Sequence, residues 1–258
     1  MTSSVLSGRI ITMSDNENQK KEILRGISNG SMIVTTANLE MDGGFGSISP
    51  VTAVTKYEEG YKVQGTKVFV PYANASKFII LPVTLDRGLA LLAVDTGNPD
   101  IKIVDMSSIG GYRQCKVDFD NAFVSTSGLL AGPDIGTRVL QQAKEWATLP
   151  QCGEILGRTE KTLEITVEYA KNRTAFGRPI GAFQAVQHRC ANLRVGIDGL
   201  RQALYQATSM IDSGLECSEQ IAITKAYAGI VSRLATETGH SIFAGIAFAM
   251  EHDMHLYT

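Results

Sequence analysis

One segment of the chain combines residue types that can bind a nucleotide. It holds Arg173 and Phe176 in a glycine-containing turn, and Gln184 follows at the predicted start of a helix. A guanidinium beside a helix N-terminus can bind a pyrophosphate through two parallel hydrogen bonds, aided by free backbone N–H groups. Phe176 offers an aromatic face for a planar ring, and the Gln184 amide both donates and accepts. An ordinary helix–helix connection with a surface arginine would read the same, so the segment alone leaves both interpretations open.

The elements that must position this turn come from two unlike halves of the chain. Residues 31–132 contain short apolar runs separated by glycines, which predicts strands over about 61–70, 78–83, 89–94 and 114–120. From residue 133 apolar residues recur at helical spacing. This predicts a long helix from about 134 to the turn, and two more over about 183–213 and 218–243. Pro150 is expected to interrupt or kink the first of them, and residues 16–24 predict a short polar helix.

These patterns predict an α+β fold. A small antiparallel β-barrel or sandwich over residues 31–132 precedes an up–down α-helical bundle over 133–258, and residues 1–30 form a separate short segment. Three long antiparallel helices do not close a bundle well, so a fourth helix is expected from this chain or from a partner.

Composition narrows the function classes. The 258 residues carry a formal net charge of −2 and no basic run, which argues against a nucleic-acid partner. The four cysteines are far apart in sequence, which is typical of free thiols in a reducing compartment. The first residues do not have the pattern of a signal peptide, and no apolar stretch is long enough to insert into a membrane. The expected location is the cytoplasm.

Further segments follow the order of one known family. They are Asn18–Gly30, Asp42–Ser47 with Gly60–Lys67, Leu129–Gly132, and His240–Phe248 with Glu251–Tyr257. Together with the Arg173 turn they resemble the acyl-CoA dehydrogenase family of flavoproteins. The resemblance covers nearly the whole chain, and it implies that residues 1–30 are a remnant of the family's N-terminal helical domain and that the last helix of the bundle is missing.

The resemblance implies FAD as the cofactor and assigns residues to it. In the family the turn after the first long helix crosses a subunit interface and contacts the FAD of a neighbouring subunit. Carried over residue by residue, the cofactor contacts are Arg173, Thr174, Phe176, Gln184, Ala244, Gly245 and Phe69. Phe69 falls where the family commonly has an aromatic residue beside the flavin ring, although an aromatic residue of the sheet core would fit the same pattern.

The implied reaction is α,β-dehydrogenation of an acyl-CoA thioester, in which a carboxylate takes the α-proton and a hydride goes to the flavin. An electron-accepting flavoprotein and a homo- or hetero-oligomer, dimer or tetramer, are the implied partners. Some members place the base in a loop that lies beyond Thr258 here, and others place it on the first long helix. That helical slot holds Ala147 and is followed by Thr148, so Glu145, two residues earlier, is the candidate base. The alternative is that Glu145 is an ordinary solvated glutamate on the helix surface.

Two departures from the family keep other functions open. Of the family's T-E-P-x-x-G-S-D motif only Gly46 and Ser47 survive, and Pro71 stands where a threonine is usual. One alternative is therefore a non-catalytic structural subunit that completes a partner's FAD site. Another is a binding module for a CoA thioester or a different planar ligand, without redox chemistry.

Two histidines are spaced as metal ligands can be. His252 and His255 are three residues apart and could share a helix face. No cysteine or third histidine lies near them in sequence, so a surface or interface role is favoured and no metal is expected.

Overall fold

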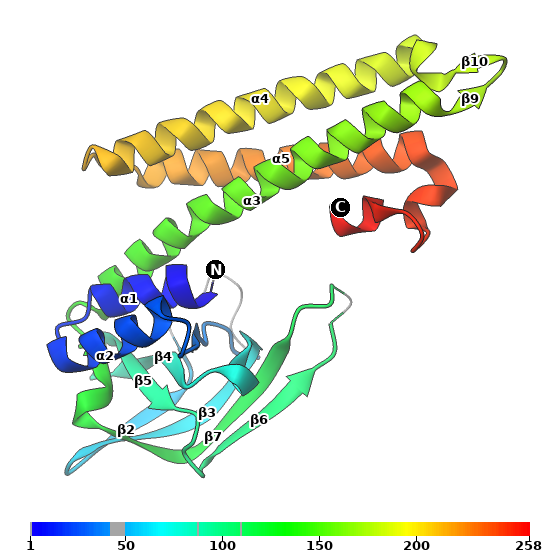
Figure 1. Cartoon of the computed structure of the whole chain (residues 1–258). Coiled ribbons are helices and arrows are strands. Elements are labelled where there is room, and N and C mark those ends of the chain that lie inside the picture. Colours follow the sequence, from blue (N-terminus) through cyan, green and yellow to red (C-terminus); the bar gives the residue numbers. More distant parts are fainter. Residues whose placement is uncertain (1, 42–49, 87, 109) are drawn as a thin grey trace. The chain divides into compact units, whose positions relative to one another are not determined.

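The structure is a computed structural model that describes residues 2–41, 50–86, 88–108 and 110–258. The chain divides into two compact units, Met1–Ala147 and Thr148–Thr258. Helix α3 (Gly136–Asn172) contains the boundary between them (Figure 1).

The first unit is built on two four-stranded sheets. One sheet has the order β1 (Val34–Thr36), β4 (Phe78–Leu85), β5 (Gly88–Asp95) and β8 (Leu129–Ala131). The other has the order β2 (Ala53–Tyr57), β3 (Gly60–Pro71), β7 (Gln114–Ser125) and β6 (Ile101–Met106). The described residues form a sandwich rather than a closed barrel. The predicted antiparallel sandwich has one parallel pair, since the short strand β1, which was not predicted, runs parallel to β4. A parallel pair needs a long crossover, and here the chain passes through β2 and β3 of the other sheet between β1 and β4.

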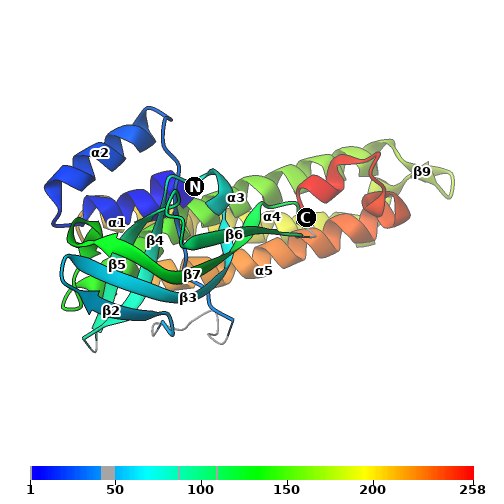
Figure 2. The same ribbon diagram turned by 90° about the horizontal axis from the view of Figure 1, so that it is seen from below.

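Two apolar layers explain why β4 and β5 are continuous hydrophobic runs. Side chains such as Val63, Leu81 and Phe119 fill the space between the sheets. On the other face, Leu91 and its neighbours pack against helical residues of the N-terminal turn Thr2–Ser7, α1 (Gly8–Thr12), α2 (Glu17–Ser28) and the start of α3. Figure 2 shows α1 and α2 beside this sheet. Because both faces are covered, these strands lose the polar alternation of a half-exposed strand.

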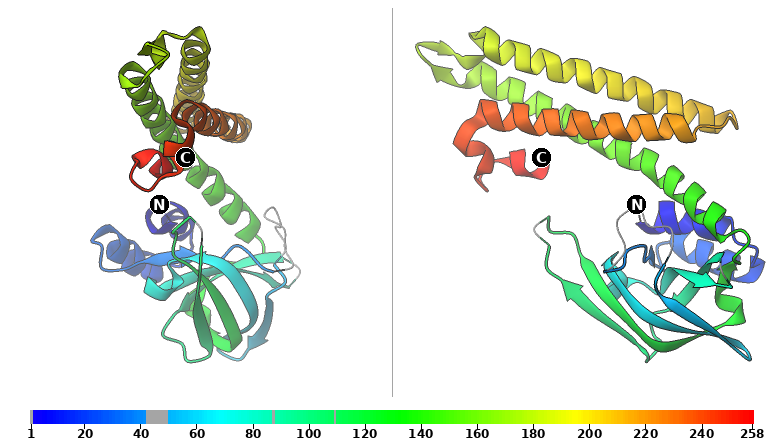
Figure 3. Two further views of the ribbon diagram at one scale, coloured as in Figure 1. Left: turned by 90° about the vertical axis from the view of Figure 1, so that its right-hand side faces the viewer. Right: turned by 180° about the vertical axis from the view of Figure 1, so that it is seen from behind.

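The second unit is a three-helix bundle (Figure 3). α3 from Thr148 onward packs with α4 (Gln184–Asp212) and α5 (Ser218–Phe243) around a core of Leu156, Leu193, Ile197, Leu200 and Val231. Two short turns follow, Ala244–Phe248 and Asp253–Leu256. α5 has the predicted bounds and α4 begins one residue later than predicted. Pro150 lies inside α3, which continues through it, so the predicted interruption was wrong.

Gly136, the first residue of α3, lies close against the β5 backbone. A Cβ at this position would lie 1.9 Å from the Leu89 carbonyl oxygen. We expect Gly136→Ala to lower the free energy of unfolding by about 1–3 kcal/mol, because helix and strand must move apart. Gly157→Ala on the same helix is the matched control, since a Cβ there meets nothing within 4 Å. It should be neutral or stabilise the chain by up to about 1 kcal/mol through helix propensity. Urea denaturation of both variants would measure this, and equal effects would contradict the steric explanation.

Candidate functional site

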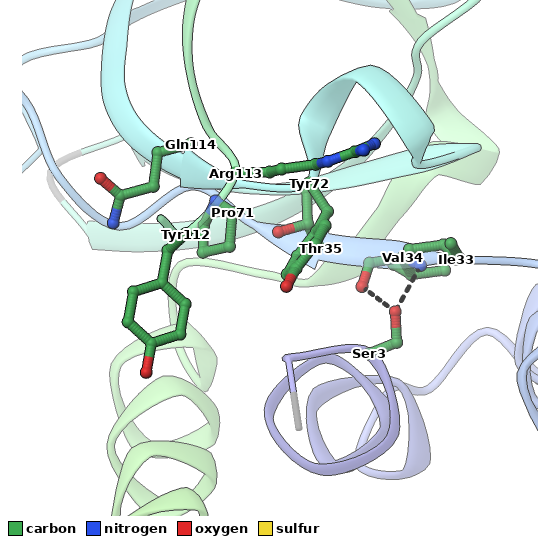
Figure 4. Close-up of a pocket in the computed structure, with 9 residues that line it drawn as sticks. All are labelled: Ser3, Ile33, Val34, Thr35, Pro71, Tyr72, Tyr112, Arg113 and Gln114. Atoms are coloured by element: carbon green, nitrogen blue, oxygen red, sulfur yellow. Dashed lines mark hydrogen bonds between the residues drawn. The ribbon is translucent and has the colours of Figure 1, made fainter. Parts of the chain in front are cut away.

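A pocket opens in the first unit where β3 ends beside the start of β7. Its volume is about 500 Å³, within the range of small-molecule sites. The lining residues come from four segments far apart in sequence (Figure 4): Ser3; Ile33, Val34 and Thr35; Pro71 and Tyr72; and Tyr112, Arg113 and Gln114. Pairing of Pro71 with Gln114 holds the β3 and β7 contributions together. Its lining combines apolar and aromatic residues with the polar residues Arg113 and Gln114.

The polar groups on the β1 side of the pocket differ in their partners. Ser3 Oγ donates to Val34 O at 2.6 Å and accepts from Val34 N at 2.8 Å, so it is engaged by the strand (Figure 4). Thr35 is only 1% exposed, and its Oγ1 has no hydrogen-bond partner among the described residues. A buried hydroxyl without a partner costs roughly 1–3 kcal/mol. A ligand group that bonds to Thr35 would therefore relieve an existing cost.

Phe69 sits on a bulge of β3 immediately before the pocket. Lys67 pairs with Val117 and Val70 with Cys115, so Val68 and Phe69 together face one residue of β7. Phe69 has φ of +52° and its side chain is 44% exposed. A left-handed backbone costs a residue with a Cβ about 1–2 kcal/mol. The bulge turns Phe69 out of the sheet core, so the alternative of a core aromatic residue is not what the structure shows.

A buried ion pair lies behind this bulge. Lys67 Nζ is 2.6 Å from Glu40 Oε1, and the two side chains are 1% and 9% exposed. Burial alone would raise the pKa of Glu40, but hydrogen bonds from Lys67, Thr52 and the Val51 N–H outweigh it and lower the pKa to about 2. Burial lowers the pKa of Lys67 from its ordinary value, and the bond to Glu40 opposes that shift. The Glu40 carboxylate is therefore ionised at neutral pH, with Lys67 Nζ held against it.

The Arg173 turn is a two-residue β-hairpin in the second unit. Its strands are β9 (Thr174–Ala175) and β10 (Arg178–Pro179), and Phe176 and Gly177 at its tip have φ of +54° and +77°. Positive φ at both central residues defines the turn that suits the twist of paired strands. Phe176 is 94% exposed.

The base of this hairpin is held by two contacts. The Ile180 N–H donates to Arg173 O at 2.8 Å, and the Arg178 guanidinium stacks 4.2 Å from the centroid of the Phe183 ring. The hairpin therefore exposes an aromatic ring at its tip, while these contacts hold its base in place.

The remaining predicted cofactor residues fall into two groups. Arg173, Thr174 and Gln184 are exposed on the hairpin and at the first residue of α4. Ala244 and Gly245 are exposed at the end of α5, where Ala244 has φ of +55°. The two groups lie at the same end of the bundle. There the ring of Tyr169, near the end of α3, stacks at 4.2 Å on Phe243, the last residue of α5.

Glu145, the predicted base, lies on α3 in the first unit. It is half-buried, and Gln141 Nε2 donates to its Oε1 at 3.2 Å. Ala147, in the slot that other members use, is buried. The structure brings neither residue into the lining of the pocket described above.

The predicted histidine pair is engaged locally. His252 Nδ1 accepts from the Met254 N–H at 3.1 Å, and His255 Nδ1 lies 2.7 Å from His252 O. In the part of the chain that the structure describes, no three histidine, cysteine or acidic side chains gather as a metal site. None of the described helices has an apolar stretch long enough to cross a membrane. The predicted motif Asp42–Ser47, with Gly46 and Ser47, lies outside the described residues.

Sequence reasoning did not single out most of the lining residues of the pocket, among them Thr35, Tyr72, Tyr112 and Arg113. The one available signal was the glycine pair before Tyr112 and Arg113, which marks a turn whose following residues are exposed.

Comparisons with known proteins agree with the fold and with the predicted family. Residues 134–258 match the family model for the acyl-CoA dehydrogenase C-terminal domain. The acyl-CoA dehydrogenase FadE27 of Mycobacterium tuberculosis is 30% identical over 239 residues, which are 88% of this chain and 61% of that protein. Residues 134–258 therefore belong to the acyl-CoA dehydrogenase family, and 88% of the chain is similar to a member of it.

Solved structures place the whole chain in the same fold. Butyryl-CoA dehydrogenase from Megasphaera elsdenii superposes with a TM-score of 0.93 at 22% identity, covering 99% of this chain and 70% of that one. A chain of the ChsE4–ChsE5 complex from Mycobacterium tuberculosis gives a TM-score of 0.88 at 25% identity, covering 99% and 68%. The chain spans about three fifths of the length of the curated relatives that it matches.

Proposed function

We propose that this chain acts as an FAD-dependent acyl-CoA dehydrogenase that introduces an α,β double bond into an acyl-CoA thioester. The observation that carries the proposal is the Arg173 hairpin, in which a left-handed turn holds Phe176 almost fully exposed beside exposed Arg173 and Thr174. An aromatic side chain in a strained backbone, with no packing partner for most of its surface, points to a function outside its own unit.

The described residues fit an FAD molecule at two places. Arg173, Thr174 and Gln184 offer donors for a pyrophosphate, and Phe176 offers a face for a planar ring. In the first unit, Thr35 offers an unsatisfied hydroxyl and Phe69 an exposed aromatic ring for the flavin end. When bound, FAD would supply the two-electron acceptor. We assign the hairpin to the cofactor of a neighbouring subunit, so the functional protein is an oligomer.

In this proposal Glu145 takes the α-proton of the thioester. The hydrogen bond from Gln141 orients its carboxylate, and a carboxylate within reach of the α-carbon is the group that this reaction needs. The electrons then leave to an electron-accepting flavoprotein. We assign the cytoplasm as the location, and the four free cysteines fit a reducing compartment.

A second candidate function is a non-catalytic subunit of a heteromer that completes a partner's FAD site. Buried Ala147 in the usual slot of the base favours it, and the ChsE4–ChsE5 structure shows that a chain of this fold can form a complex with a different chain. Such a subunit would keep the Arg173 hairpin and would not need Glu145.

One spectrum separates the two functions. We would measure flavin absorbance per chain in the purified protein, before and after anaerobic addition of a panel of acyl-CoAs. About one flavin per chain that bleaches with a thioester supports the dehydrogenase. Flavin that is absent, or present and never bleached, supports the partner-dependent subunit.

The hairpin assignment makes a prediction about affinity. Arg173→Ala should weaken FAD binding by roughly 1.5–3 kcal/mol, about 10- to 150-fold in Kd, because the pyrophosphate loses a charge-assisted partner. Arg194→Ala is the control, since this exposed arginine pairs with Asp198 at 2.9 Å on α4. Fluorescence titration with FAD would measure both variants. Equal flavin retention in the two would refute the role of Arg173.

A further inference from the structure

The buried ion pair links β3 to the segment that follows β1, and both strands contribute residues to the pocket. Glu40 is five residues beyond Thr35 of β1, and Lys67 is four residues before Pro71 of β3. Lys67 Nζ donates to Glu40 Oε1 at 2.6 Å and to Pro82 O of β4 at 3.1 Å. Neither charged side chain lines the pocket. Any effect of this pair on a ligand must therefore pass through the backbone.

A main-chain hydrogen bond connects the same two segments a second time. The Val68 N–H donates to Leu39 O at 3.0 Å, and these two residues form an isolated bridge between the segments. Leu39 and Glu40 are thus tied to Lys67 and Val68 by adjacent backbone and side-chain bonds. Val68 is itself the first residue of the bulge that exposes Phe69.

The carboxylate of Glu40 is fixed on its other side as well. It accepts from Val51 N at 2.5 Å, from Thr52 N at 2.9 Å and from Thr52 Oγ1 at 2.5 Å. These donors lie eleven and twelve residues further along the chain. Four hydrogen bonds leave the carboxylate little freedom, so the lysine that it binds is also held in one place.

Stability of the fold does not by itself explain why two charges are buried here, because a protein with an apolar pair of similar volume at such a place is often equally stable. A hydrogen-bonded ion pair differs from an apolar contact in allowing one relative position of its partners. The left-handed residue that follows, Phe69, is the kind of strained position that persists only where surrounding bonds over-determine it.

We propose that Glu40 and Lys67 are a positioning pair, which holds the β3 bulge so that the exposed ring of Phe69, two residues before the pocket residue Pro71, stands in a fixed orientation for a planar ligand ring. The identity of that ring as a flavin rests on the proposed function. The fixed orientation of Phe69 does not, and the two parts can be tested separately.

The first test follows the side chain without any ligand. Phe69→Trp, combined with Trp146→Phe to remove the single native tryptophan, places one indole at the bulge. In this background, Glu40→Met/Lys67→Met removes the buried pair and preserves a foldable apolar interior. Glu17→Met/Lys20→Met removes an exposed pair of 2.9 Å as the matched control. Circular dichroism checks that both double variants are folded.

Time-resolved fluorescence anisotropy is the readout. We expect loss of the buried pair to add a nanosecond or faster component to the indole decay, and loss of the exposed pair to add none. Identical decays in the two double variants would overturn the proposal.

The second test adds FAD to the same two double variants with Phe69 and Trp146 restored. We expect Kd to rise about tenfold without the buried pair and to stay unchanged without the exposed one, since a ligand site loosens when its support is removed. If the indole becomes mobile but the Kd for FAD does not change, the proposed effect of the pair on FAD binding is overturned. A mobile indole in a protein that never binds flavin would sink the proposed function and leave the positioning of Phe69 supported.

Discussion

Glu40→Gln should lower the free energy of unfolding of the unit Met1–Ala147 by about 3–5 kcal/mol. The substitution keeps the shape of the side chain but leaves the Lys67 cation buried and opposite a neutral amide. Removing one partner of a buried pair costs this much because the remaining charge has neither water nor a counter-ion. One carboxylate oxygen becomes an NH₂ group, so either the Val51 N–H or the Thr52 donors lose their acceptor, which would act in the same direction.

The native tryptophan makes this measurable in the full chain. Trp146 belongs to the first unit, where the Arg9 guanidinium lies 4.4 Å from its ring centroid, so its fluorescence reports the unfolding of that unit in urea. Glu17→Gln is the control, because the Glu17–Lys20 pair is exposed and should contribute less than about 1 kcal/mol. Similar losses in the two variants would show that the buried pair does not contribute more than a surface pair.

Acid should reproduce part of the Glu40 effect. The pKa of Glu40 is depressed from 4.5 to about 2 in the folded chain. A depressed acid stabilises the folded state above its unfolded pKa, and that stabilisation is lost as pH falls toward the folded pKa. Between about pH 4.5 and 2 the native chain should therefore lose more stability than Glu40→Gln, which has no group to protonate at this position. Parallel pH profiles of the urea midpoint would count against the assignment.

Glu145→Gln should reduce turnover of an acyl-CoA about 10²- to 10⁴-fold if Glu145 is the base, because the amide cannot accept the α-proton. Binding of FAD should be unchanged, since Glu145 is not among the proposed cofactor contacts. The measurement is the rate of anaerobic flavin bleaching. Glu154→Gln is the control, an exposed glutamate further along α3. Full activity in both variants would remove Glu145 from the mechanism and point to a base supplied by another residue or another chain.

The features that the sequence predicted well are local ones. The bounds of α5 and the turn at Phe176 and Gly177 depend on residues close together in the chain, where periodicity and glycine placement carry the information. Helical spacing also predicted the two other long helices to within a few residues. The prediction that Pro150 interrupts the helix rested on its missing N–H group, but α3 continues through it.

The features that it missed depend on contacts between distant residues. Glu40 and Lys67 are 27 positions apart, and nothing in either neighbourhood indicates the other. The pocket joins residues from Ser3 to Gln114, and its members become neighbours only once β3 pairs with β7. The orphaned hydroxyl of Thr35 is a property of its surroundings rather than of its residue type. The parallel pairing of β1 with β4 was missed for the same reason, because a three-residue strand carries no signal for its direction.

The exposed tip of the hairpin, under the proposed function, links cofactor retention to protein concentration. A site completed by Phe176 and Arg173 of a neighbour exists only in the associated state. FAD binding and subunit association are therefore thermodynamically coupled. Dilution would release the cofactor, and added FAD would hold the subunits together at concentrations where the apoprotein separates. A single Kd for FAD would then have no meaning unless the chain concentration is stated beside it.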